Sequence, residues 1–167
     1  MKKLKPEFWY DSIYDIDFKQ MYNDGIRALF FDIDNTMEGY DQTEPSEKLL
    51  EFTESLQEMG FRVAVLSNAK AGRSEYFAKK MQVDFEGHAL KPKLKGFRNL
   101  AERIGVKPSE VAMIGDQLFT DIWGANRFGC RSILVTPIDL DGDPGFVKFK
   151  RVFEQPIIKK CSKTKGK

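Results

Sequence analysis

Four short runs of apolar residues recur along the chain and predict buried β-strands. Each run is largely continuous instead of alternating with polar residues, which indicates a strand that is covered on both faces. Strands of this kind are typical of a parallel sheet with helices packed against it. The four runs are residues 27–34, 61–67, 110–115 and 131–136.

Between these runs, apolar residues recur at helical spacing. Residues 46–59 begin with a serine suited to cap a helix, carry one apolar stripe and are followed by a glycine that would end the helix. Similar patterns predict helices over 96–104 and 120–128, and a weaker one over 73–81. This alternation predicts an α/β fold with a doubly wound, mostly parallel, Rossmann-like sheet, whose active site lies beyond the carboxyl ends of the strands.

The length of 167 residues fits a single core domain, which we place at residues 25–155. Residues 1–24 are rich in aromatic side chains and stand outside the alternation, so we expect this segment to pack on the core. Contact with a membrane is the alternative for it. Beyond a turn-forming string at 141–145, residues 156–167 are expected to form a basic, frayed tail.

The net charge of +2 hides an uneven distribution along the chain. Residues 146–167 hold eight Lys or Arg and one acid, Glu154, whereas residues 1–145 hold 19 basic and 24 acidic side chains. An acidic body therefore precedes a basic end. The basic end could contact an anionic membrane surface, or it could serve only as a solvated tail.

The composition excludes several classes of protein. Apolar residues make up 41% of the chain, with 14 Phe, 5 Tyr and 2 Trp, which excludes a disordered chain. No apolar run exceeds four residues, so we expect neither a membrane-spanning helix nor a signal peptide. The two cysteines and the single histidine, His88, exclude a disulfide framework and a multi-histidine metal site. We expect a cytoplasmic protein, with peripheral contact at the inner face of the membrane if the basic end binds lipid, and a structural or solvent-facing His88.

Two carboxylates, Asp32 and Asp34, follow the first predicted strand directly. Alternate residues of an extended chain point to the same side, so these acids would repel each other unless a divalent cation lay between them. Burying such charges without a cation is costly. Alternatively, the segment from Asp34 to Thr36 forms only a turn after the strand.

A second predicted strand also ends in an acid, Asp116, with Asp121 further along. Parallel strands end at one edge of the sheet, so Asp116 is expected to face Asp32, and Gly115 would allow a close approach.

A third strand ends at Ser67 and Asn68, which offer hydrogen-bond donors to an anion, and Lys91 supplies a cation from a loop. Carboxylates for a metal, donors for an anion and a lysine together indicate phosphoryl chemistry with Mg²⁺ as cofactor.

Taken in order, these segments resemble the four motifs of the haloacid dehalogenase (HAD) superfamily of phosphatases. The stretch from Gly115 to Asp121 and the residues after it resemble the YqeG family of subclass IIIA, which is similar to phosphatidylglycerophosphatases. The resemblance covers about residues 4–155; it departs from the family pattern at Met37, Ala69 and Lys150, outside the catalytic motifs. The four motifs are Asp32-x-Asp34-x-Thr36, Ser67-Asn68, Lys91-Pro92 and Gly115-Asp116-x-x-x-x-Asp121.

The resemblance implies a role for each of these residues. Asp32 would be the nucleophile that forms an aspartyl-phosphate, and Asp34 the acid that protonates the leaving group and then the base that activates water. Lys91 would neutralise charge on Asp32 and on the phosphoryl oxygens. The phosphate-binding set would be Ser67, Asn68 and Thr36, the last also bracing the nucleophile loop. The metal set would be Asp32, the backbone carbonyl of Asp34, Asp116 and Asp121, the last orienting a metal-bound water or Lys91.

The intervals between the motifs bear on the substrate. HAD caps are inserted between the first and second or the second and third motifs, and each interval here has room for about one helix, so we expect no cap domain and an open site. An open site suits a phosphate displayed on a large object. The leading hypothesis is a phosphoric monoester hydrolase that converts phosphatidylglycerophosphate to phosphatidylglycerol, with a lipid head group as its phosphorylated partner.

Two alternatives remain open from the sequence. The first is a soluble HAD phosphatase that acts on a sugar, nucleotide or nucleic-acid phosphate. The second is a non-enzymatic module that binds RNA or a protein through the basic end and the N-terminal aromatic residues. Asp34, the acid that would protonate the leaving group, is present, which favours an enzyme over a binding module. Nucleic acid is the less favoured partner.

Overall fold

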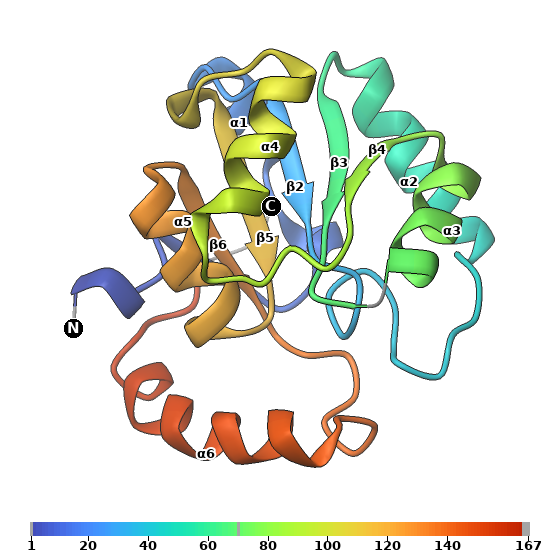
Figure 1. Ribbon diagram of the computed structural model, residues 1–167. Helices are drawn as coiled ribbons and strands as arrows, with labels where there is room; N and C mark the ends of the chain where they lie inside the picture. The colour runs from blue at the N-terminus through green and yellow to red at the C-terminus, as the bar shows by residue number, and fades with distance from the viewer. Residues whose placement is uncertain (1, 70, 165–167) are drawn as a thin grey trace.

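The computed structural model describes residues 2–69 and 71–164 and contains one sheet of six strands (Figure 1). Every strand pairing in the sheet is parallel, and the strand order is β1-β6-β5-β2-β3-β4. The predicted α/β class with a single doubly wound sheet is confirmed. The strands are β1 (Phe8–Tyr10), β2 (Ala28–Phe31), β3 (Arg62–Leu66), β4 (Asp84–Glu86), β5 (Val111–Gly115) and β6 (Arg131–Val135).

Helices cover both faces of the sheet. Apolar residues of α1, α2 and α3 pack on one face, and those of α4 and α5 pack on the other. A five-residue π-helical turn, Leu118–Ile122, leads directly into α5. The helices are α1 (Phe18–Asn23), α2 (Glu47–Glu58), α3 (Ala71–Met81), α4 (Leu94–Ile104), α5 (Trp123–Phe128) and α6 (Gly145–Ile158), with 3-10 turns at Lys2–Leu4, Ile13–Asp15 and Pro108–Glu110.

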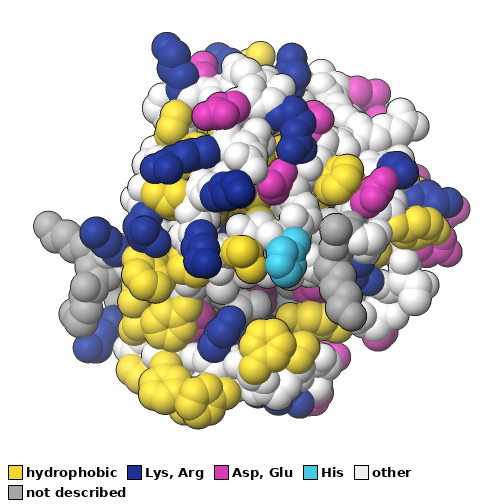
Figure 2. All heavy atoms as spheres, in the orientation of Figure 1, with side chains coloured by type: hydrophobic (Ala, Val, Ile, Leu, Met, Phe, Trp, Pro, Cys, Tyr) yellow, Lys and Arg dark blue, Asp and Glu magenta, His cyan; other side chains and the backbone are white. Residues whose placement is uncertain are grey.

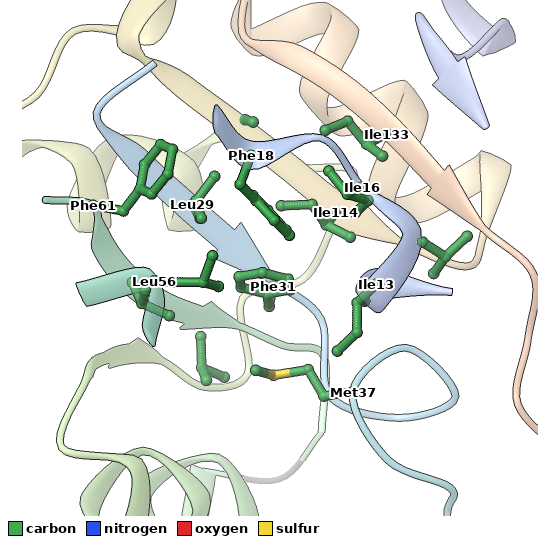
Figure 3. Packing of buried hydrophobic residues seen from close by; sticks show 14 of the residues in the cluster. Ile13, Ile16, Phe18, Leu29, Phe31, Met37, Leu56, Phe61, Ile114 and Ile133 are labelled. Carbon is green, nitrogen blue, oxygen red and sulfur yellow. The ribbon is translucent and has the colours of Figure 1, made fainter. Parts of the chain in front are cut away.

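Strand β2 lies at the centre of the sheet, and all four of its residues are buried. Its side chains alternate between the two faces: Leu29 and Phe31 join the core beneath α1, α2 and α3, whereas Phe30 joins the core beneath α4. Figure 3 shows Leu29 and Phe31 among residues contributed by several elements, including Phe18 and Leu56. Because both faces of β2 are buried, its sequence is continuously apolar.

The N-terminal segment, residues 1–24, contains elements that the apolar pattern does not predict. Phe8–Tyr10 forms the edge strand β1, which pairs with β6, and Phe18 and Met21 of α1 are buried against the sheet. The edge strand β4 was also missed, since its sequence Asp-Phe-Glu contains one apolar residue. Edge strands of three residues carry too little apolar pattern to be recognised.

Between the first and third motifs, the residues that the structure describes form no added domain. The interval from Thr36 to Ser67 holds a loop, α2 and β3, and the interval from Ser67 to Lys91 holds α3 and β4. The expectation of a fold without a cap domain is confirmed for the described residues. Helix α6 runs across the carboxyl edge of the sheet in Figure 1.

Helix α6 includes the first residues of the segment 156–167, which we expected to be a frayed tail. The helix continues past this proline to Ile158, and the backbone N–H of Thr164 donates to the carbonyl of Trp9 (2.6 Å). Both Pro156 and Val152, whose carbonyl has no helical N–H partner, are exposed, so water can supply that hydrogen bond. Residues 165–167 of the expected tail lie outside the described residues.

Candidate active site

Three buried carboxylates meet at the carboxyl edge of the sheet. Asp32 directly follows β2, Asp116 directly follows β5, and Asp121 lies in the π-helical turn. One carboxylate oxygen from each lies within 4.8 Å of the others. The structure thus brings together residues from two strand ends, as the sequence predicts.

Lys91 lies between two of these carboxylates. Its Nζ is 2.9 Å from Asp32 Oδ1 and 2.7 Å from Asp121 Oδ1, and its side chain is almost fully buried. Burial opposes the charged ammonium, but Asp121 and Asp32 outweigh it and raise the pKa of Lys91. Lys91 is therefore a permanent cation of the cluster.

The main chain at Lys91 is held by the side chain of Asn68. Asn68 Nδ2 donates to the Lys91 carbonyl (3.1 Å), and the Lys91 backbone N–H donates to Asn68 Oδ1 (2.7 Å). The adjacent Ser67 hydroxyl accepts from the backbone N–H of Ala69 (3.0 Å). The Asn68 amide thus positions the lysine, and Ser67, Asn68 and Ala69 line the pocket described below.

The cluster has more buried acids than cations. Burial, with Asp121 as a further repulsive charge, raises the pKa of Asp32 to about 7 and that of Asp116 to about 8, although Lys91 and Arg151 respectively oppose the shifts. Oxygen atoms of carboxylates are the ligands that Mg²⁺ prefers, and an added divalent cation would remove this electrostatic cost. The residues present therefore fit a divalent metal ion.

Gly115 has a steric role in this cluster. A Cβ at Gly115 would lie 2.3 Å from Asp121 Oδ2 and 2.5 Å from Asp121 Cβ, far inside contact distance. The expected close approach is thus made by the Asp121 side chain. Any larger residue would displace Asp121, whose Oδ2 accepts from the backbone N–H of Gln117 (3.1 Å).

Asp116 is held by two donors from other elements. Thr36 Oγ1 donates to Asp116 Oδ1 (3.1 Å), and Arg151 Nη2 of α6 donates to Asp116 Oδ2 (2.5 Å). Arg151 also pairs with the buried Asp143. Thr36, predicted in the phosphate-binding set, therefore lies against Asp116 and not in the pocket lining. Its hydroxyl braces a carboxylate at the neighbouring strand end.

The carboxylate of Asp34 is separate from this cluster and pairs with an arginine of α3. Arg73 Nε lies 2.9 Å from Asp34 Oδ1, and its other nitrogens donate to the carbonyls of Gln42 and Gly39. Burial raises the pKa of Asp34, although Arg73 acts in the opposite direction. Arg73 is not predictable from the sequence, because nothing in its local sequence marks it as a partner of a residue 39 positions away.

A cavity of about 150 Å³ opens beside Asp32. This volume is below the roughly 300–1,000 Å³ of sites that enclose a drug-sized ligand, so it can hold a phosphoryl group while the remainder of a large substrate stays outside. The N-terminal part of α6 lines it through Phe146, Val147 and Lys150, which the sequence did not indicate. The predicted residues that line it are Asp32, Asp34, Ser67, Asn68 and Lys91.

The loop before α6 is tied to the loop after β2 by Asn35. Its backbone is left-handed (φ 61°), a conformation that asparagine tolerates. Asn35 Nδ2 donates to Asp143 Oδ1 and to the Asp139 carbonyl, both at 2.7 Å. His88, by contrast, is exposed, as we expected for a solvent-facing residue.

Glu154, on the inner side of α6, is expected to make stability depend on pH. Its Oε1 accepts from the backbone N–H of Phe119 (2.9 Å), but burial outweighs this bond and raises its pKa from 4.5 to about 7. The folded state thus keeps a proton that the unfolded chain releases, so stability falls as the pH rises through this window. Glu154→Gln removes this titration.

Between pH values of about 5 and 8, the natural protein should lose about 2–3 kcal/mol of unfolding free energy relative to Glu154→Gln, measured by urea unfolding. Because a buried glutamine amide carries its own pH-independent cost, the informative quantity is the difference in slope. Parallel pH profiles for the two proteins would contradict the prediction.

The chain is similar in sequence to known hydrolases. The model of a hydrolase family, the haloacid dehalogenase-like hydrolases, matches residues 16–129. The probable phosphatase YqeG of Bacillus subtilis is 30% identical over 157 residues, which cover 94% of this chain and 91% of that protein. The chloroplastic/mitochondrial phosphatidylglycerophosphate phosphatase 1 of Arabidopsis thaliana is 29% identical, covering 87% of this chain and 44% of that longer protein.

Among solved structures, the fold resembles a cobalt-bound deoxy-D-mannose-octulosonate 8-phosphate phosphatase, YrbI of Haemophilus influenzae. The TM-score is 0.53 at 16% identity, and the alignment covers 79% of this chain and 89% of the other. At this identity the likeness concerns the fold alone.

Proposed function

Because the chain belongs to the haloacid dehalogenase-like hydrolase family and is a phosphatase, we propose that it hydrolyses phosphatidylglycerophosphate to phosphatidylglycerol with Mg²⁺ as cofactor. The observation that carries the proposal is the buried group of Asp32, Lys91, Asp116 and Asp121 beside a cavity of phosphoryl size, with Asp34 at the same cavity. A nucleophile, a second acid and a cluster for a cation are the parts that phosphoryl transfer through an enzyme carboxylate needs.

Asp32 is the nucleophile in this proposal. Its carboxylate attacks phosphorus, the bond to the substrate alkoxide breaks, and an aspartyl-phosphate forms. Lys91 is already bound to Asp32 Oδ1, so it orients the carboxylate and neutralises charge that moves onto the phosphoryl oxygens. The hydroxyl of Ser67 and the backbone N–H of Asn68 bind those oxygens at the end of β3.

Asp34 transfers the protons. Protonated, it donates to the leaving alkoxide; ionised, it then takes a proton from the water that hydrolyses the aspartyl-phosphate. Its raised pKa supports the acid form, and Arg73 stabilises the ionised form that results. The ion pair with Arg73 also keeps this carboxylate out of the cluster around Lys91.

The metal site in this proposal uses residues at two strand ends. Asp32, Asp116 and the Asp34 carbonyl would hold Mg²⁺, with Asp121 orienting Lys91 and Thr36 bracing Asp116. When bound, the ion supplies positive charge for the phosphoryl oxygens.

A lipid substrate is supported by two observations. The Arabidopsis relative, which is similar over 87% of this chain, is named a phosphatidylglycerophosphate phosphatase. The small cavity lies at an edge of the sheet with no cap domain among the described residues, so the bulk of a large substrate can remain outside. Among the described residues, none of the helices could span a membrane.

The test compares phosphate release from phosphatidylglycerophosphate in mixed micelles with release from a panel of sugar, nucleotide and nucleic-acid phosphates. Each reaction is run in Mg²⁺, in chelator, and in chelator followed by excess Mg²⁺. We expect the highest kcat/KM for the lipid and loss of activity in chelator that Mg²⁺ reverses. A higher kcat/KM for any soluble monoester would contradict the lipid assignment, and activity that survives chelation would contradict the metal assignment.

A further inference from the structure

The outer side of α6 carries four large apolar side chains that nothing among the described residues covers. Phe146, Phe149, Val152 and Phe153 are exposed by 65%, 66%, 66% and 55% of their surface. Their spacing places them on one stripe of the helix, and the rings of Phe149 and Phe153 contact each other with centroids 5.0 Å apart. Contiguous apolar surface of this kind marks a site of interaction.

The inner side of the same helix is charged and fixes it to the active site. Val147, Arg151 and Glu154 are buried, and Arg151 binds Asp116 of the carboxylate cluster. The helix thus has inverted polarity, with ionic groups toward the protein and phenylalanines outward. Its inner contacts hold the apolar stripe in a fixed orientation relative to the cluster.

Lysines border the stripe, and α6 exposes no acid. By helical spacing, Lys148 and Lys150 lie on opposite sides of the stripe. Lys159 and Lys160 follow the helix directly. The single acid of α6 is Glu154, which is buried. Figure 2 shows hydrophobic side chains gathered along the lower edge, over α6, with Lys and Arg beside them. This combination of phenylalanines and lysines is typical of helices that lie in the interface of an anionic membrane.

The stripe begins at the cavity itself. Phe146 and Lys150 line the cavity beside Asp32, and Phe146 is also the first member of the exposed stripe. A surface that covers the stripe therefore also lies across the mouth of the cavity. A phosphate that projects from such a surface would be near Asp32.

We propose that the stripe of Phe146, Phe149, Val152 and Phe153 docks α6 onto an anionic phospholipid bilayer and turns the cavity toward the lipid head groups. The expected effect of docking on lipid hydrolysis rests on the proposed function. Charge complementarity favours lipid over a second copy of the chain, because a two-fold interface would bring the lysines of two α6 helices together without an exposed acid of α6 to pair them.

The test is co-sedimentation of the full chain with vesicles of phosphatidylcholine alone or mixed with phosphatidylglycerol. We expect binding to the mixed vesicles and a loss of at least about tenfold in partitioning for the double variant Phe149→Ser/Phe153→Ser. The matched control is Met59→Ser/Tyr76→Ser, which removes two exposed apolar side chains of the α2 and α3 region and should bind as the natural protein does. None of these four residues lines the cavity.

Hydrolysis of a soluble monoester, para-nitrophenyl phosphate, monitors the active site in each variant and should be unchanged. For Phe149→Ser/Phe153→Ser, the rate of phosphatidylglycerophosphate hydrolysis in mixed vesicles should decrease in parallel with the loss of vesicle binding. Absence of vesicle binding by the natural protein, equal binding by both double variants, or a dimer in solution that only the Phe149→Ser/Phe153→Ser variant disrupts would overturn the docking proposal. Stripe-dependent vesicle binding without lipid hydrolysis would leave docking intact and overturn the lipid substrate instead.

Discussion

Asp32→Asn is expected to lower turnover of any phosphate monoester at least about a thousandfold. An amide oxygen at this position is a poor nucleophile and gives no aspartyl-phosphate. The fold should persist, because the amide is close in shape to the carboxyl and Lys91 keeps its contact with Asp121 at 2.7 Å. Burial raises the pKa of Asp32 to about 7, which means that its ionised form is costly in the folded protein. The unfolding free energy should therefore change by no more than about 1 kcal/mol.

The measurement is kcat with a saturating soluble monoester together with urea unfolding of the same preparation. Asp84→Asn is the matched control, because it makes the same chemical change at an exposed acid of the edge strand β4. The control should keep its turnover within about twofold of the natural protein. Turnover of Asp32→Asn within about tenfold of the natural value would remove Asp32 from the nucleophile role.

The sheet was predictable from sequence where its strands are buried on both faces. The residues of β2 and β5 are fully buried, so their apolar runs reveal both the strand and its parallel neighbours. At the edges this signal disappears, as in β4, where Asp84 and Glu86 flank one phenylalanine. The limit is physical, because an edge strand needs less apolar sequence than a central one.

Helix α6 was missed for the opposite reason. A helix normally buries its apolar side, and pattern recognition depends on that rule. Here Arg151 and Glu154 face the protein and the phenylalanines face outward, so the pattern carries no sign of which side packs. The contacts of Arg151 with Asp116 and Asp143 show why the charged side is the inner one.

The site was predictable where its residues end strands. Asp32 and Asp116 were found because an acid directly after a buried strand is conspicuous, and parallel topology brings such ends together. Arg73 and Arg151, which hold Asp34 and Asp116, lie 39 and 35 positions from their partners. Nothing local in the sequence marks such long-range pairs, so the supporting cations appear only in three dimensions.

Lys91→Met is expected to destabilise the protein by about 3–5 kcal/mol in metal-free buffer at a pH of about 8, because it leaves buried carboxylates without their shared cation. The cost should be smaller at a pH of about 6. The pKa values of Asp32 and Asp116 are already raised to about 7 and about 8, so both acids take up protons as the pH falls and the repulsion weakens. Urea unfolding at the two pH values measures the difference.

Mg²⁺ should restore part of the stability of Lys91→Met, because the ion supplies the missing positive charge among the carboxylates. Turnover should stay about a hundredfold or more below the natural value even with Mg²⁺, since the ammonium that contacts Asp32 Oδ1 is lost. Lys93→Met is the matched control, as Lys93 is exposed two residues away. Equal loss of stability in both variants would contradict the role of Lys91 as the shared cation of the carboxylates. If Mg²⁺ stabilised Lys91→Met no more than it stabilised the control, the cluster would not be the metal site.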